Sequence, residues 1–165
     1  MNKILCFLVC LTVFTLSCFI YSQESSGPAV ASATDETNES MLKQFDGKWS
    51  LKEAMIGGSP FPEEVLKTIT LTMQDGGYDV RVGDVRDTGK LKVDVSKSPM
   101  TMDITGEEGP NKGKVLRCIF KIEKEKLIIC YQLDGDERPT KFESEKGSTT
   151  MLATYEHAAK QEEKK

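Results

Sequence analysis

The sequence offers few side chains for catalysis, because His157 is the only histidine among its 165 residues. A Ser–His or Cys–His nucleophilic site would have to use this residue, and the sequence contains neither a G-x-S-x-G nor an H-E-x-x-H motif. A zinc site would need more histidine and cysteine ligands than the predicted domain contains. We therefore predict no catalytic residue, no metal site and no cofactor, and we do not expect an enzyme.

One acidic cluster could bind a cation. Asp134, Asp136 and Glu137 provide the oxygen ligands that calcium prefers, but the spacing of an EF-hand is absent. Asp-Gly-Asp is also a common turn sequence, so we interpret the cluster as a turn. A hydrolase that uses two carboxylates stays open as a further hypothesis, and it predicts two acids converging in a cleft.

Methionine and aromatic side chains are better candidates for a binding site. Met73, Met100 and Met102 lie in segments of alternating polarity, where flexible thioethers either fill gaps in a core or line an adaptable pocket. If the domain encloses a cavity, we expect its interior ligand-binding surface to include Met73, Tyr78, Val80, Met100, Met102 and Tyr131.

Alternation of apolar and polar residues predicts the strands that carry these side chains. Residues 69–73 and 78–82 both alternate, and Asp75-Gly76-Gly77 between them indicates a tight hairpin. Pairing Met73 with Tyr78 brings the apolar residues of both segments onto one face. Strands are also predicted in residues 49–55, 91–95, 100–104, 116–122, 127–133, 139–143 and 149–156.

The spacing of these segments predicts an all-β fold. Consecutive hairpins favour an antiparallel meander of eight or nine short strands, and closure into a β-barrel removes its open edges. An open sandwich is the alternative. The only helical signal lies in residues 59–66, where prolines precede two glutamates.

Two cysteines, Cys118 and Cys130, fall on neighbouring strands of one predicted hairpin. The register that joins the apolar faces places Cys118 opposite Tyr131, and Cys130 opposite Ile119 on the other face. Side chains on opposite faces cannot reach disulfide geometry, so a bond between them would need a bulge or a shifted register.

The N-terminal segment predicts export. Residues 1–22 combine one lysine, an apolar run and a small residue at Ser22, which is the layout of a signal peptide, and residues 29–31 offer a second cleavage site. An uncleaved anchor and lipidation of Cys18 are the alternatives, and only these would give a membrane contact. We expect a periplasmic, extracellular or cell-surface protein.

The remaining chain divides by composition. Residues 23–40 lack aromatic side chains and predict a flexible acidic linker, residues 41–157 a single barrel domain, and residues 158–165 a charged disordered tail. The net charge of −4 argues against a nucleic-acid binder. The expected partner is therefore a small apolar molecule or another protein.

Several short motifs in residues 41–157 are similar to those of a known protein family. They read Phe45-Asp46-Gly47-Lys48-Trp49, Gly89-Lys90-Leu91, Asp94-Val95-Ser96-Lys97-Ser98-Pro99, Met102-Asp103-Ile104, Leu127-Ile128-Ile129-Cys130-Tyr131 and Arg138-Pro139-Thr140-Lys141-Phe142. In these motifs the chain resembles a family of uncharacterised secreted domains abundant in planctomycete-type bacteria. The resemblance implies a lipocalin-like barrel and an exported protein, but no reaction, because the family has no assigned activity.

The segment Gly47-Lys48-Trp49 is also similar to the Gly-x-Trp opening of lipocalins. That resemblance implies that Trp49 plugs the closed end of a barrel, with a basic residue near the last strand packed over its ring. This chain has His157 at that place, so either Arg138 supplies the contact or the contact is absent. We assign structural roles to Gly47, Trp49, Arg138 and Pro139.

Two leading hypotheses differ in what the barrel contains. An exported binding barrel would hold a small apolar or amphipathic ligand in a cavity lined by methionine and valine, with residues 60–66 at its rim. A filled barrel would serve instead as a protein-interaction or scaffold module, with no cavity and an exposed apolar patch. The fold alone does not decide between them.

Overall fold

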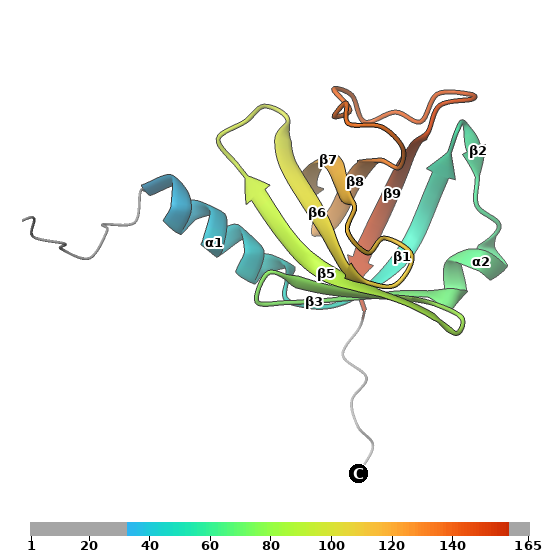
Figure 1. Ribbon diagram of the computed structural model, residues 1–165, viewed down its shortest axis with the longest axis horizontal. Coiled ribbons are helices and arrows are strands. Elements are labelled where there is room, and N and C mark those ends of the chain that lie inside the picture. Colours follow the sequence, from blue (N-terminus) through green and yellow to red (C-terminus); the bar gives the residue numbers. More distant parts are fainter. Residues whose placement is uncertain (1–32, 159–165) are drawn as a thin grey trace, which may run out of the picture. The chain divides into compact units, whose positions relative to one another are not determined.

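The structure is a computed structural model that describes residues 33–158 (Figure 1). The predicted signal peptide, with Cys18 and both cleavage sites, lies outside the described residues. So do residues 23–32 of the predicted linker and residues 159–165 of the predicted tail.

A closed antiparallel β-barrel forms the domain, as the alternation predicts. From β3 to β9 each strand pairs with the next in a meander. β1 pairs with both β3 and β9, which closes eight strands into the barrel, and β2 is an additional edge strand that pairs with the end of β1 (Figure 1). The strands are β1 (Gly47–Ile56), β2 (Ser59–Pro60), β3 (Ile69–Gln74), β4 (Gly77–Val82), β5 (Val85–Asp94), β6 (Met100–Glu108), β7 (Val115–Glu123), β8 (Lys126–Gln132) and β9 (Thr150–His157).

The strand registers agree with the predicted ones. In the β3–β4 hairpin, Met73 pairs with Tyr78, and the turn between them contains Gly76 at φ 74°, a conformation that glycine adopts without strain. In the β7–β8 hairpin, Cys118 pairs with Tyr131 and Cys130 with Ile119. Both cysteines are free thiols on opposite faces, and burial raises the pKa of each.

A helix, α1 (Ala33–Phe45), replaces part of the predicted linker, so the prediction of flexible chain through Ser40 is wrong for residues 33–40. The helix contacts β3 and β5, and Phe45 at its end is completely buried. The side chain of Asn38 accepts a hydrogen bond from the Val95 amide at 3.0 Å, which ties the middle of the helix to the barrel. Tertiary packing thus stabilises a helix whose own composition is mostly polar.

A short helix, α2 (Glu63–Thr68), lies where the sequence predicts one. Pro62 precedes it in an extended conformation, and two glutamates occupy the first turn. Their negative charges interact favourably with the positive end of the helix dipole. It follows the β1–β2 hairpin and contacts β1 and β3. Among the described residues, neither helix is long and apolar enough to cross a membrane.

Residues 134–149, which we call the strap, connect β8 to β9 without forming a strand, so the predicted strand at 139–143 is wrong. The side chain of Arg138 holds this segment against the outside of the barrel, in place of the backbone hydrogen bonds that a strand would form. Its guanidinium donates to the carbonyls of Met102 at 2.9 Å and Cys118 at 2.6 Å, and it forms an ion pair with Asp103. The outward-facing side chains of Ile119 and Cys130 are buried, and Cys130 Sγ contacts the strap carbonyl of Glu143 at 3.5 Å.

Candidate ligand-binding site

One end of the barrel is closed by aromatic side chains. Phe45 of α1 meets Phe120 edge-on, with ring centroids 5.4 Å apart, and both rings are completely buried. Trp49 is buried beside them, and its indole nitrogen donates to the Phe45 carbonyl at 2.7 Å. The start of β1 and the end of α1 therefore seal this end together.

His157 packs on the indole of Trp49, with ring centroids 3.7 Å apart and an interplanar angle of 32°. Gly47 lies against the same imidazole, because a Cβ there would meet its ring atoms at 3.4 Å. Arg138 binds the outer face of β6 and β7 instead, so it does not supply the predicted basic contact. Pro139 follows it in the strap and lines a hollow on that outer face.

A cavity of about 320 Å³ occupies the barrel between this closed end and α2. Its wall is mostly apolar and is built from the inward faces of the strands, with Phe61 and Val65 contributed from the α2 side. Five of the six predicted interior residues line it: Met73, Tyr78, Val80, Met102 and Tyr131. Met100 does not line it, because it pairs with Phe120 toward the closed end.

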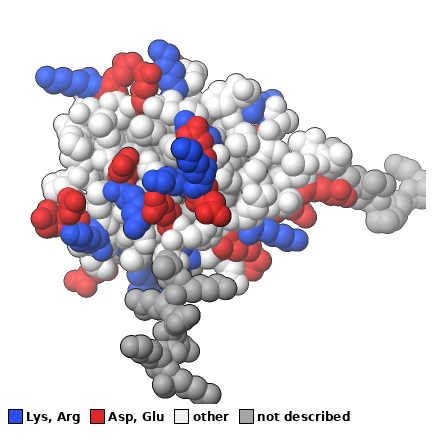
Figure 2. All heavy atoms as spheres, turned by 180° about the vertical axis from the view of Figure 1, so that it is seen from behind, with Lys and Arg blue, Asp and Glu red and all other residues white. Residues whose placement is uncertain are grey.

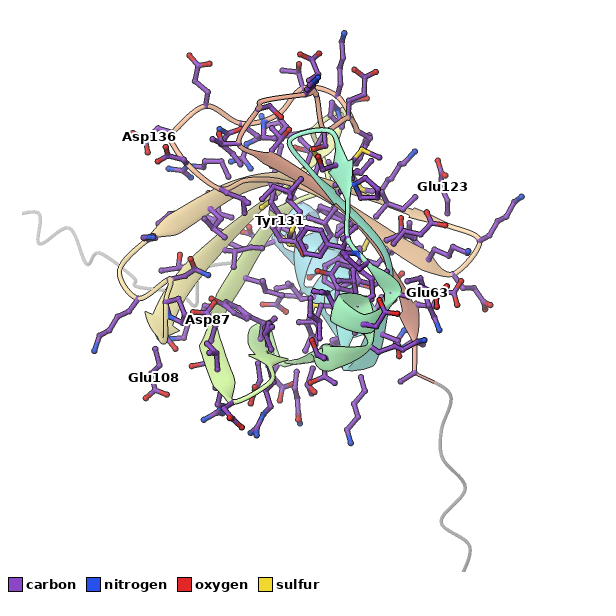
Figure 3. All side chains as sticks on the ribbon, turned by 90° about the vertical axis from the view of Figure 1, so that its right-hand side faces the viewer. Glu63, Asp87, Glu108, Glu123, Tyr131 and Asp136 are labelled. Carbon is purple, nitrogen blue, oxygen red and sulfur yellow. The ribbon has the colours of Figure 1, made fainter. Side chains whose placement is uncertain are left out.

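Two tyrosines form a buried pair in the cavity wall. The hydroxyls of Tyr131 on β8 and Tyr155 on β9 lie 2.9 Å apart and hydrogen-bond to each other. Figure 3 shows Tyr131 in the middle of the ring of strands. Burial raises the pKa of Tyr155 to about 12 and that of Tyr131 well above its usual value. Both phenols are therefore neutral near pH 7, and one hydroxyl donates its proton to the other.

A second polar group in the wall centres on Asp87 of β5, which is 8% exposed. Its carboxylate accepts hydrogen bonds from the Tyr78 hydroxyl at 3.0 Å, the Asn111 side-chain amide at 2.9 Å and the Asn111 backbone amide at 3.0 Å. Burial, followed by the hydrogen bond and the charge of Asp87, raises the pKa of Tyr78. Asp87 is not among the interior residues predicted from the sequence, although its even spacing from Leu91 places it on the inward face of β5.

Apolar side chains surround the open end of the cavity. Val65 of α2, Val82 and Val85 beside the β4–β5 turn, and Val115 at the start of β7 are all exposed. Met55 and Ile56 at the end of β1 are exposed as well. These positions lie at the strand ends opposite Trp49, so the mouth of the cavity has an apolar rim.

Charged residues do not form a field of one sign on the face drawn in Figure 2, where positive and negative side chains alternate in small groups. Asp134, Asp136 and Glu137 are exposed in the strap, and Asp136 points away from the barrel (Figure 3). Within residues 33–158, no three histidine, cysteine or acidic side chains come together in a way that could hold a metal ion.

Comparison of the chain with protein-family models, curated proteins and solved structures gives no match. The geometry of the cavity therefore carries the functional assignment.

The two buried tyrosines predict a loss of stability in alkali. Because their folded-state pKa values lie above about 10, the value expected for an unfolded chain, their contribution is complete below pH 10. It is lost as the pH rises through about 12, the folded-state pKa of Tyr155. We expect denaturant midpoints to fall steeply between these pH values and tyrosinate absorbance to appear together with unfolding. If both phenols titrate near pH 10 while the protein stays folded, the two tyrosines are not buried as described.

Proposed function

We propose that this barrel binds one small apolar or amphipathic molecule in its interior. The observation that carries the proposal is the cavity of about 320 Å³. Its volume lies at the lower end of the range of about 300–1,000 Å³ typical of small-molecule sites. A barrel of eight strands is wide enough to hold one such ligand when side chains do not fill it.

The chemistry of the wall supports an apolar occupant. Leu71, Met73, Leu91, Met102 and Ile104 contribute apolar surface from three strands, β3, β5 and β6. Transfer of a ligand from water onto this surface is favourable by about 25 cal/mol per Å² buried. Tyr131 and Tyr155 share one hydrogen bond, so only one of the two hydroxyls keeps an O–H that a polar group of the ligand could accept.

The apolar residues around the mouth of the cavity support entry of the ligand from the end of the barrel where α2 lies. Phe61 and Val65 line the cavity from the connection between β1 and β3, which makes this segment part of the rim. The exposed valines on the neighbouring strand ends continue the apolar surface outward. A ligand can therefore pass from the rim into the cavity along apolar side chains.

The competing hypotheses have less support. A filled interaction module predicts no cavity, whereas this interior has room for a ligand. A hydrolase with two carboxylates predicts converging acids, but Asp87 is the only acidic residue in the described lining of the cavity.

Titration of the full chain with a neutral fluorescent probe, N-phenyl-1-naphthylamine, tests the proposal. We expect saturable binding of one probe per chain with enhanced fluorescence, because the probe enters an apolar environment. Absence of saturable binding would overturn the proposed function and favour the filled module.

A further inference from the structure

The geometry points to a ligand with a positive charge: we propose that the occupant of the cavity is an amphipathic amine whose ammonium group pairs with Asp87. This inference rests on the proposed function and adds the chemical class of the ligand. The observation that carries it is a buried carboxylate that lines an apolar cavity without a cationic partner among the described residues.

The hydrogen bonds of Asp87 give its carboxylate no positively charged partner. All three donors, from Tyr78 and Asn111, are neutral groups. A carboxylate has about four acceptor positions and these bonds occupy three, so Oδ1, which accepts only the Asn111 backbone amide, can accept one more hydrogen bond.

The basic residue next to Asp87 in the sequence binds another carboxylate. Arg86 precedes Asp87, and its guanidinium binds Asp79 on the outside of the barrel at 2.8 Å. The described lining of the cavity contains no lysine, arginine or histidine. A buried charge is costly unless an opposite charge pairs with it, so a cationic group in the cavity would gain from Asp87, whereas a carboxylate would be repelled.

The position of Asp87 also fixes how the amine would lie. Asp87 pairs with Val80, two residues from the mouth end of β4, and Leu91 follows it on the inward face toward the closed end. Figure 3 places Asp87 on the β5 side of the opening. The ammonium group would therefore sit near the mouth, and the apolar part would extend toward Leu71 and Met73.

Asp87 also has a structural role that the test must separate from ligand binding. Its two bonds to Asn111 hold the β6–β7 loop, and a Cβ on Gly109 would lie 2.9 Å from its carboxylate. Asp87→Asn keeps the size of the side chain and one oxygen acceptor while removing the charge. Asp84→Asn is the matched control, because Asp84 is an exposed carboxylate in the β4–β5 turn.

The experiment measures how n-decylamine, 1-decanol and decanoate displace the neutral naphthylamine probe from the full chain. These ligands share one chain length and differ in charge. We expect the amine to bind about tenfold or more tightly than the alcohol, and decanoate to bind most weakly, because a charged hydrogen bond exceeds a neutral one. In Asp87→Asn the advantage of the amine should fall to about twofold or less, whereas Asp84→Asn should retain it.

Each contrary result has its own meaning. Equal displacement by the amine and the alcohol in the unaltered protein would overturn the amine assignment and leave the binding barrel standing. Equal weakening of all three ligands by Asp87→Asn would overturn it as well, because Asp87 would then only hold the loop. If the probe itself does not bind, the proposed function fails. The comparison of ligands on the unaltered protein needs no variant, so it decides the question even if Asp87→Asn does not fold.

Discussion

Replacement of Phe120 by alanine is expected to lower the free energy of unfolding by about 3–5 kcal/mol. The ring is completely buried at the closed end of the barrel, where it meets Phe45 of α1 edge-on at 5.4 Å. Its removal leaves a void beneath the helix and also takes away the aromatic contact between α1 and the barrel. Urea denaturation at neutral pH measures the change.

Phe142→Ala provides the control for this substitution. Phe142 lies half-buried in the strap, where its ring contacts the Lys121 ammonium at 4.7 Å. Loss of a partly exposed ring leaves little enclosed void, so we expect a change of about 1 kcal/mol or less. Equal destabilisation by the two substitutions would contradict the placement of Phe120 as the packing centre of the closed end.

Arg138→Ala is expected to destabilise the protein by about 2 kcal/mol, because two backbone carbonyls lose their donor. Asp103 retains Arg117 as an ion-pair partner, which limits the loss. The strap should also become more sensitive to proteolysis within residues 134–149.

The matched control is Arg86→Ala, which removes an arginine that pairs with Asp79 but has a side chain 52% exposed. A surface ion pair contributes little to stability, so this variant should denature close to the unaltered protein and keep the strap protected. If both arginine variants behave alike in denaturation and proteolysis, Arg138 does not anchor the strap.

The barrel and its registers were predictable because both depend on local patterns. Alternation of period two identifies which face of each strand is buried, and a tight turn such as Asp75-Gly76-Gly77 then sets the register of the hairpin. The pairing of Met73 with Tyr78 and of Cys118 with Tyr131 follows from these two signals. From β3 to β9 the meander required only that consecutive strands pair.

The helix α1 and the strap were not predictable in this way, because contacts distant in sequence hold them. The polar composition of residues 33–40 resembles a linker, and their helical state depends on Asn38 reaching Val95 and on Phe45 reaching Phe120. The apolar residue Phe142 suggests a strand, but the strap is bound by Arg138 and by the Cys130–Glu143 contact instead.

The candidate site was partly predictable for the same reason. Period two places a side chain inside or outside the barrel but does not give its depth along the barrel axis. Met102 and Met100 share the inward face of β6, yet only Met102 reaches the cavity. Asp87 fits the alternation upstream of Leu91, but an acidic residue is rarely expected on an inward face. Its hydrogen bonds to Tyr78 and Asn111 depend on contacts distant in sequence.

The most direct test of the binding barrel is to fill the cavity without altering the outside. Ile104 on β6 lines the cavity, and its neighbour Thr105 is exposed on the same strand. We expect Ile104→Phe to weaken binding of the naphthylamine probe about tenfold or more, because the added ring occupies the volume that the ligand needs, whereas Thr105→Phe should leave the affinity within about twofold. Equal affinities for the two variants would place the bound probe outside the barrel and contradict an interior binding site.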